Sequence, residues 1–343
     1  MITALEFEKP IFELEKKIAE LKHLSSNGHL NLQSEVKKLE TRLNHLKKET
    51  YLQITPWQRV QLARHPQRPY MLDYVQMIFS DFVEFHGDRT FADDKALVCG
   101  FAKLEDQTFL VMGHQKGRDA KENIMRNFGS AHPEGYRKSL RLMKMAEKFD
   151  TPIVAFVDTP GAYPGVGAEE RGQAYTIALN IREMARVQVP ILVIVIGEGG
   201  SGGALGIGVG DRVLVLENAY YSVISPEGCA AILWKDRTKA PDAAAALKLT
   251  AKDLLDLKLI DEMIKEPLGG AHRGPEETAE AVKSAIKKYW KELQSIGKTE
   301  LIERRYDKFR KMGVFETVQA SAVVHKIHLK HERKQLKKRV SSS

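Results

Sequence analysis

The sequence predicts an α/β fold that is preceded by an N-terminal helical hairpin. Three observations support this prediction: apolar residues recur every three or four positions near the N-terminus, short β-rich apolar runs follow, and helical patterns alternate with these runs. Strands that are apolar on both faces and are linked by helices are typical of a largely parallel, helix-covered sheet. We therefore expect a buried sheet at the core of this chain.

The hairpin is expected over residues 6–49. Its first apolar stripe has the spacing of an amphipathic helix and consists of Ile11, Leu14, Ile18 and Leu21. The polar run 25–28 breaks this pattern. A second stripe then restores it with Leu32, Val36, Leu39, Leu43 and Leu46. Two interpretations of the stripes stay open, because they can pack on the chain's own core or contact another subunit.

A connector is expected at 57–70, and the α/β part follows it. Strands are expected at 96–102, 107–113, 152–158, 190–196, 212–216 and 221–224. Helices are expected at 136–149, 169–187, 241–247, 251–257 and 276–294. The run Ser225-Pro226-Glu227-Gly228 indicates a turn that opens one more helix. The basic tail 317–343 has no clear pattern, and we expect it to be mobile.

The bulk composition is typical of a soluble globular protein of the cytoplasm. The chain has 343 residues, of which 43% are hydrophobic and 29% charged. The longest apolar stretch, 191–196, is too short to span a membrane. Glutamates at positions 6, 8 and 13 interrupt any signal-peptide core. Cys99 and Cys229 fit a reducing compartment, and we expect both to be buried and unreactive.

The charge and the histidines define two further expectations. No Cys-x-x-Cys pair occurs, and the closely spaced histidines His325, His328 and His331 lie in the tail, so no metal site is expected in this chain. The net charge is +8, and residues 326–339 hold seven Lys or Arg against one Glu. Such a run favours weak nucleic-acid binding as a side activity, because phosphates attract clustered cations.

A glycine-rich segment at 197–204, GEGGSGGA, follows an apolar strand and is the most informative part of the sequence. Successive positions without Cβ let the backbone approach a ligand closely, and free N–H groups at a helix start favour negative charge there. The alternative is a tight strand-to-helix turn that binds nothing. The segment also contains GxGxxG at Gly197, Gly199 and Gly202, which is typical of dinucleotide binding. The next expected strand begins near residue 212, which leaves too little room for the crossover helix of that motif.

A second segment at 158–165, DTPGAYPG, also stands at the end of a strand. Two prolines and two glycines in six residues fix an irregular loop that regular structure cannot satisfy. It is either a rigid connection or one wall of a pocket that faces the first segment. Neither segment supplies a nucleophile or a base.

Long motifs around these segments resemble one family, the alpha subunits of acetyl-CoA carboxylase carboxyltransferase. The motifs are DTPGAYPGVGAEERGQ from Asp158, VIGEGGSGGALGIGVGD from Val195, YSVISPEGCAAILWKD from Tyr221 and EPLGGAH from Glu266. HGDR at 86–89, GHQKGRD at 113–119 and the hairpin extend the resemblance over about residues 5–316. The tail is not part of the pattern.

The resemblance implies a crotonase-like fold of repeated ββα units and an organisation of three parts: the hairpin and connector at 1–56, the carboxyltransferase domain at 57–316 and the tail at 317–343. It also implies transfer of a carboxyl group from carboxybiotin, held on a biotin carboxyl carrier protein, to acetyl-CoA. The product is malonyl-CoA for fatty acid synthesis. The implied partners are a beta subunit in an alpha2beta2 assembly and biotin carboxylase. Biotin is not attached to this chain.

The resemblance also implies the site residues. The oxyanion hole for the ureido oxygen of biotin falls on Gly202 and Gly203. The biotin pocket is shaped by Gly161, Ala162, Tyr163, Gly165 and Val166, with the Tyr163 and Gly165 amides expected to orient the ligand. Backbone donors suffice for this chemistry, so no catalytic triad is required.

The charged residues of the matching region keep two interpretations. Lys116, Arg118 and Lys138 could contact CoA phosphates or a carboxylate, or they could be solvated surface residues or form ion pairs within the fold. The histidines are expected to be structural at positions 86, 114, 132 and 272. The competing functions are a stand-alone crotonase-like decarboxylase or hydratase, and a nucleic-acid-binding protein.

Overall fold

The computed structural model describes residues 4–26 and 32–313. The chain divides into two units, residues 1–310 and 311–343. The predicted tail at 317–343 lies outside the described residues.

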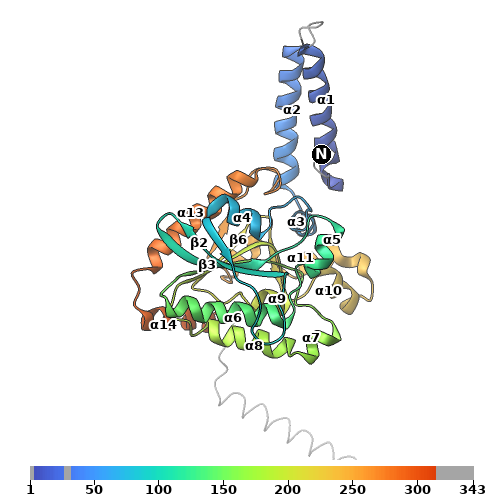
Figure 1. Ribbon diagram of the computed structural model, residues 1–343. Helices are drawn as coiled ribbons and strands as arrows, with labels where there is room; N and C mark the ends of the chain where they lie inside the picture. Colours follow the sequence, from blue (N-terminus) through green and yellow to red (C-terminus); the bar gives the residue numbers. More distant parts are fainter. Residues whose placement is uncertain (1–3, 27–31, 314–343) are drawn as a thin grey trace, which may run out of the picture. The chain divides into compact units, whose positions relative to one another are not determined.

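One mixed sheet forms the centre of the first unit (Figure 1). Its strands are β1 (Ser80–Glu84), β2 (Leu97–Leu104), β3 (Gln107–His114), β4 (Ile153–Thr159), β5 (Ile191–Gly200), β6 (Arg212–Leu216), β7 (Tyr220–Ser222) and β8 (Glu262–Ile264). The order is β1-β2-β3-β4-β5-β6-β8, and β7 pairs with the end of β5. Pairing is antiparallel from β1 to β3 and parallel from β3 onward.

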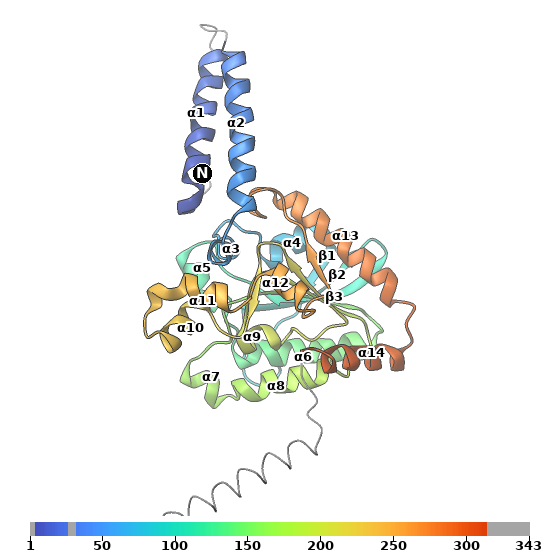
Figure 2. The ribbon, with the colours of Figure 1, turned by 180° about the vertical axis from the view of Figure 1, so that it is seen from behind.

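Helices cover both faces of this sheet. Figures 1 and 2 show α6 and α8 on one face, and α4 and α13 on the other. The helices are α1 (Lys9–Ser26), α2 (Gln33–Leu52), α3 (Pro56–Ala63), α4 (Met71–Ile78), α5 (Ala120–Met125), α6 (Pro133–Lys148), α7 (Val166–Glu170), α8 (Gln173–Met184), α9 (Ser201–Leu205), α10 (Pro226–Leu233), α11 (Ala240–Ala246), α12 (Ala251–Asp256), α13 (Pro275–Leu293) and α14 (Lys298–Arg310). In the described residues none is both long enough and apolar enough to cross a membrane.

The central strands are apolar because both of their faces are covered. Every residue of β4 and β5 is buried, as expected for parallel strands between helical layers. β-Branched residues dominate β5 up to Ile196, where the glycines begin. Burial of this run supplies much of the hydrophobic stabilisation of the fold.

Most of the predicted elements are confirmed. The six expected strands correspond to β2 to β7, and the expected hairpin corresponds to α1 and α2, which pack on each other. The break expected at 25–28 falls partly on residues outside the described range, although α1 continues through Ser25 and Ser26. Cys99 and Cys229 are buried, as predicted.

Two predictions were wrong. The single helix expected at 169–187 is α7 and α8, because Gly172 between them adopts the left-handed conformation with φ of 82°. The connector expected at 57–70 is largely helical, since Thr55 caps α3 and Pro56 occupies its first turn. The short strands β1 and β8 were not predicted; β8 has only three residues.

Helix α14 closes the fold through one buried side chain. The Arg305 guanidinium is 1% exposed and pairs with the Asp211 carboxylate at 2.7 Å. It also donates to the carbonyls of Met184, Val187 and Val189. One cation therefore satisfies a carboxylate and three main-chain acceptors at the amino ends of β5 and β6.

We predict that Arg305→Met lowers the free energy of unfolding by about 3–5 kcal/mol, because Asp211 stays buried without its cation. The matched control is Arg304→Met. Arg304 pairs with Glu300 on the exposed face of the same helix, so its loss should cost no more than about 0.5 kcal/mol. Urea denaturation of the two variants and the parent measures both values; equal losses would contradict the assignment.

Candidate active site

The two glycine segments meet at the carboxyl ends of neighbouring parallel strands. β4 leads into residues 158–166, and β5 runs into residues 197–204. Thr159 pairs with Gly199, after an irregularity that follows the Val157 and Val195 pair. The two segments therefore lie side by side, as the pocket interpretation of the second segment requires.

The segments touch through main-chain atoms. A methyl group added at Gly203 would lie 2.4 Å from the Ala162 nitrogen and 2.5 Å from the Gly161 carbonyl carbon. One added at Gly200 would lie 2.2 Å from the Pro160 carbonyl oxygen. Since real Cβ atoms do not approach so closely, only glycine fits at these two positions.

Helix α9 places amide groups at this contact. Its five residues begin at Ser201, whose φ of 49° lies in the left-handed region that non-glycine residues rarely adopt. Gly202 and Gly203 occupy the first turn, where N–H groups have no acceptor within the helix. Gly202 is partly exposed and Gly203 is buried. Because Ser201 has this strained conformation, the backbone changes direction between β5 and α9, and the amides of Gly202 and Gly203 follow that change.

The dinucleotide interpretation of GxGxxG fails in this structure. Gly197 and Gly199 are inside strand β5, and α9 ends at Leu205, well before β6 begins at Arg212. A dinucleotide motif needs a crossover helix that returns across the sheet. Glu217, at the position of a ribose-binding acid, accepts from Lys265 instead.

Tyr163 fixes the position of the second glycine segment, residues 158–165, through its N–H group and its ring. The Tyr163 N–H donates to the Ala131 carbonyl at 3.0 Å, and its ring stacks on His132 at 4.1 Å between centroids. The expectation that the Tyr163 amide orients a ligand is therefore corrected, because that amide is already paired. Gly165 lies against the Tyr163 ring and caps α7, which begins at the exposed Val166. The tyrosine shapes this loop through its ring.

A buried ion-pair cluster lies at the base of both segments. The Lys116 Nζ is 2.7 Å from the Asp158 Oδ1 and 2.8 Å from the Glu198 Oε2. The Arg64 Nε donates to the Glu198 Oε1 at 2.7 Å, and the Tyr220 hydroxyl donates to the same oxygen at 2.7 Å. We call Lys116, Asp158, Glu198 and Arg64 the basal cluster.

The two carboxylates of the basal cluster have different electrostatic settings. Burial would raise the pKa of Glu198, but Lys116 and Arg64 outweigh it and hold that pKa at about 2. Burial raises the pKa of Asp158, and Lys116 only partly opposes this effect. Both groups point away from solvent, at 1% exposure for Asp158 and 6% for Glu198. The cluster is thus a structural support beneath the glycine segments.

The structure also decides between the two interpretations of the basic residues. Lys116 belongs to the basal cluster, and Lys138 is fully buried with its Nζ 2.7 Å from the Asp93 carboxylate. Arg118 pairs with Asp73 and donates to the Arg68 carbonyl at 3.0 Å. All three form ion pairs within the fold; those of Lys116 and Lys138 are largely buried, whereas the Arg118 side chain is 42% exposed.

The four histidines that were expected to be structural have surroundings that fit this expectation. His86 and His132 hydrogen-bond to loop side chains, Asp93 and Asn127 respectively. His114 and His272 are buried, and burial is the largest cause that lowers the pKa of each ring to about 3. Both rings are therefore neutral at physiological pH.

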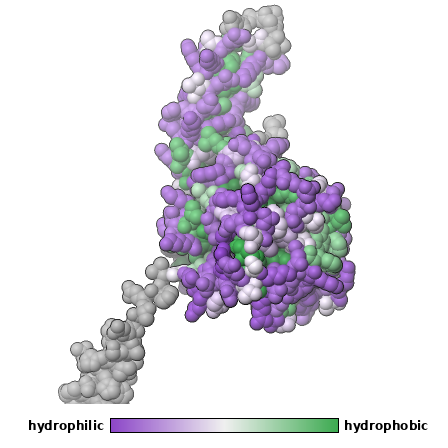
Figure 3. Space-filling model, turned by 90° about the vertical axis from the view of Figure 1, so that its left-hand side faces the viewer, coloured by the Kyte–Doolittle hydropathy of each residue, from purple (hydrophilic) through white to green (hydrophobic). Residues whose placement is uncertain are grey.

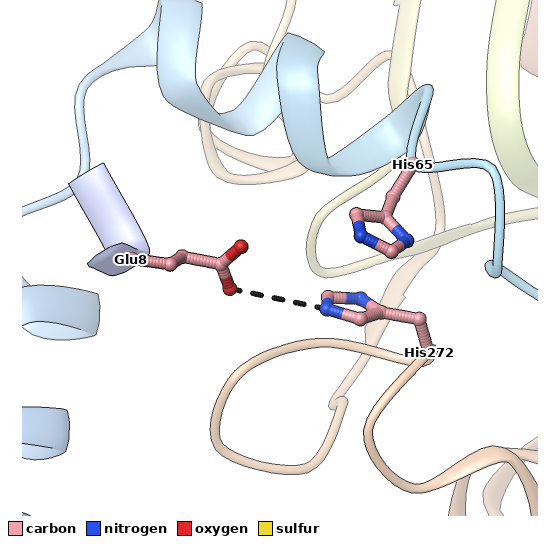
Figure 4. Close-up of side chains that lie close together, drawn as sticks. All are labelled: Glu8, His65 and His272. Atoms are coloured by element: carbon pink, nitrogen blue, oxygen red, sulfur yellow. Dashed lines mark ion pairs between the residues drawn. The ribbon is translucent and has the colours of Figure 1, made fainter. Parts of the chain in front are cut away.

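A polar cluster that the sequence did not predict joins the N-terminal turn to the α/β part. Figure 4 shows Glu8 pointing toward His272, with the His65 ring lying over the His272 ring. The Glu8 Oε1 is 3.9 Å from the His272 Nε2 and accepts from the Tyr51 hydroxyl at 2.5 Å. These residues are distant in sequence, so no spacing pattern could have revealed them.

This polar cluster is not arranged for a metal ion. The three residues offer ligand atoms within 4.8 Å of one another. However, the two imidazole rings are stacked at 3.9 Å with only 20° between their planes, so their in-plane lone pairs do not converge on one point. The Arg273 Nε, 3.9 Å from Glu8, adds a repelling cation. The cluster is better described as a contact that fixes the N-terminal segment.

Exposed apolar side chains lie next to both glycine segments in the chain and at the end of α10. α10 and the residues beside it expose Val223 at 77%, Ile232 at 68% and Leu233 at 68%. Leu205 at the end of α9 and Val166 at the start of α7 are also exposed. Exposed apolar groups at a site's rim are typical of a surface that contacts another protein.

A separate cavity of about 650 Å³ lies between the β2–β3 turn and α13, lined by residues such as Phe109, Trp290 and Lys287. It is at the start of β3, whereas the glycine segments follow the carboxyl ends of β4 and β5. Figure 3 shows the side on which α13 and α14 lie; it is mainly hydrophilic with small apolar areas. This cavity is therefore no part of the candidate site.

Comparison with known proteins decides the family. Residues 4–313 match the family described as acetyl co-enzyme A carboxylase carboxyltransferase-like. The acetyl-coenzyme A carboxylase carboxyl transferase subunit alpha of Thermus thermophilus is 58% identical over 311 residues, 91% of this chain and 98% of the relative. The chain belongs to this family of alpha subunits. The relative of the same name from Geobacter metallireducens is 59% identical over 311 residues, again 91% of this chain and 98% of the relative.

Solved structures confirm the crotonase-like α/β fold of this alpha-subunit family member. A Pseudomonas malonate decarboxylase hetero-tetramer in complex with coenzyme A aligns with a TM-score of 0.55 at 15% identity, over 76% of this chain and 98% of that chain. Transcarboxylase 12S aligns with a TM-score of 0.52 at 17% identity, over 74% of this chain and 44% of that chain. These likenesses show the fold alone.

The polar cluster of Glu8, His65 and His272 predicts how the stability of the protein depends on pH. Because the folded chain holds the pKa of His272 at about 3, the unfolded chain binds more protons below about pH 6.5, and stability falls as the pH decreases. We predict that His272→Leu reduces this fall by up to about 1.4 kcal/mol per pH unit. Urea unfolding at about pH 7.5 and about pH 5.5 measures it. Equal slopes for variant and parent would show that His272 is not held neutral.

Proposed function

We propose that this chain is the alpha half of a carboxyltransferase that moves a carboxyl group from carboxybiotin to acetyl-CoA and so forms malonyl-CoA. The family match over residues 4–313 supports this activity. The observation that carries the proposed site is the main-chain contact between Gly203 and the Gly161–Ala162 peptide. This contact places the first-turn amides of α9 beside the irregular loop that follows β4, at the carboxyl ends of β4 and β5.

The proposed oxyanion hole consists of the N–H groups of Gly202 and Gly203. When bound, carboxybiotin supplies the carboxyl group, and negative charge develops on its ureido oxygen as that group leaves. First-turn amides are donors fixed in place by the fold, so they stabilise this charge without reorganising. One such donor contributes about 3 kcal/mol to the transition state.

The proposed biotin pocket is completed by the second segment. Gly161 and Ala162 bring main-chain atoms close to α9, and the Tyr163 ring, stacked on His132, holds the loop that continues through Gly165 and Val166. No acid or base of this chain takes part in the proposal. The buried carboxylates Asp158 and Glu198 act only through the shape of the loops.

We further propose a beta subunit in an alpha2beta2 assembly as the partner that completes the site. The exposed apolar side chains of α9 and α7 support this assignment, because these helices begin at the ends of the two glycine segments. The carrier protein and biotin carboxylase are the other proposed partners, and the cytoplasm is the proposed location. The proposed domain limits are 1–56, 57–316 and 317–343.

The decisive experiment is co-expression with the beta subunit, followed by an assay of biotin-dependent conversion of malonyl-CoA to acetyl-CoA. We expect activity from the complex and none from this chain alone. Turnover by the isolated chain would instead favour a stand-alone crotonase-like decarboxylase.

We predict that Gly203→Ala lowers the kcat of the complex by about 10²–10³-fold. This is the effect that the loss of one oxyanion-hole donor typically has on kcat. The added methyl group cannot fit 2.4 Å from the Ala162 nitrogen, so the two segments must separate. The control is Gly297→Ala, where no heavy atom lies within 4 Å of the added methyl group. Normal turnover by Gly203→Ala would overturn the site.

The basic run at 326–339 supports nucleic-acid binding as a separate side activity. We predict that deletion of residues 318–343 abolishes salt-sensitive retention of RNA or DNA and leaves carboxyl transfer intact. Filter binding at low and high salt, together with the transfer assay, measures both properties. Loss of both properties together would contradict their separation.

A further inference from the structure

We propose that Lys116 is a positioning residue for carboxyl transfer, because it is the side chain that joins the two glycine segments of the site to each other. The inference rests on the proposed function and assigns a task to a residue that contacts neither biotin nor acetyl-CoA. Its evidence is the geometry of the basal cluster.

Lys116 bridges the bases of both segments. Its Nζ is 2.7 Å from the Asp158 Oδ1, immediately before the loop 159–166, and 2.8 Å from the Glu198 Oε2, immediately before the glycines 199–203. The Glu198 N–H donates to the same Asp158 oxygen at 2.9 Å. One ammonium group therefore bridges β4 and β5 at the point where the two segments begin.

Charge explains why a cation is needed there. Two carboxylates that are almost fully buried repel each other unless a counter-charge lies between them. Of these two carboxylates Arg64 reaches Glu198, at 2.7 Å from the end of α3, and it shares its charge with Glu227. Asp158 has Lys116 as its ion-pair partner among the described residues. Without Lys116, the Asp158 carboxylate would move away from Glu198 or take up a proton.

The methylene chain of Lys116 is fixed by packing, as its ammonium group is fixed by ion pairs. A methyl group added at Gly129 would lie 3.0 Å from the Lys116 Cγ, so the stem packs on that glycine. The side chain is only 11% exposed. These contacts exclude a mobile surface lysine that binds a phosphate and indicate a rigid spacer.

A shift at the base of the segments reaches the site directly. Gly203 contacts the Gly161–Ala162 peptide, and Gly200 contacts the Pro160 carbonyl, without space for one methyl group. A relative movement of the segments changes where the α9 amides point. A misplacement of about 1 Å costs on the order of 10²-fold in rate.

The experiment compares two buried lysines in the full complex with the beta subunit. Lys116→Met keeps an unbranched side chain up to the position of the lysine Cε and removes the ammonium group with its charge. The matched control is Lys308→Met: Lys308 is 16% exposed, pairs with Asp261, and lies at the amino end of β6, the opposite end of the sheet from the glycine segments. Both variants should unfold at lower urea concentration than the parent.

We expect Lys116→Met to lower kcat on the order of 10²-fold with little change in the KM for the acyl-CoA, whereas Lys308→Met keeps the kcat of the parent. The double variant Lys116→Met with Asp158→Asn removes the unbalanced charge and keeps an acceptor for the Glu198 N–H. It should recover part of the lost kcat, and it replaces Lys116→Met if that variant does not fold.

The outcomes separate this inference from the proposed function. Parental kcat in a folded Lys116→Met complex, or in the double variant if the single one does not fold, would overturn the positioning role while carboxyl transfer stands. An equal loss of kcat in Lys308→Met would also overturn it, since the effect would then be general destabilisation. If the parent complex transfers no carboxyl group, the proposed function itself fails.

Discussion

The contact between two main chains at the ends of β4 and β5 is the constraint on which the site depends. Gly203 and Gly200 lie against residues 160–162 so closely that no side chain fits between them. This contact needs parallel strands at adjacent positions, a strand that continues into glycine, and a helix that starts in a strained conformation at Ser201. The rest of the α/β layer holds these three features in place.

The fold could be predicted from the sequence wherever a local pattern determines it. β4 and β5 are continuous apolar runs because both faces are buried, and the amphipathic spacing of α1 and α2 is plain in the chain. The break at Gly172 was missed, since the helical pattern continues across it and only the backbone conformation reveals it. β8 was missed because three residues carry too little pattern.

The candidate site was predictable in part for the same reason. The glycine segments are visible in the chain, and their meeting follows from the parallel order of the strands. The partners of Lys116, Arg118 and Lys138 were not predictable, because each pairs with a carboxylate more than 40 residues away in the chain. The stack of His65 on His272 is a similar case. Contacts between charged or polar side chains that are distant in sequence produce no local pattern from which they could be predicted.

The position of Arg305 has a consequence for the order in which the protein is made. This residue, near the end of α14, neutralises Asp211 and satisfies carbonyls around residues 184–189. During synthesis on a ribosome these groups emerge about a hundred residues before their partner. The charge of Asp211 is therefore balanced late, and a nascent chain that stops short of α14 keeps an unneutralised carboxylate beside the amino end of β6.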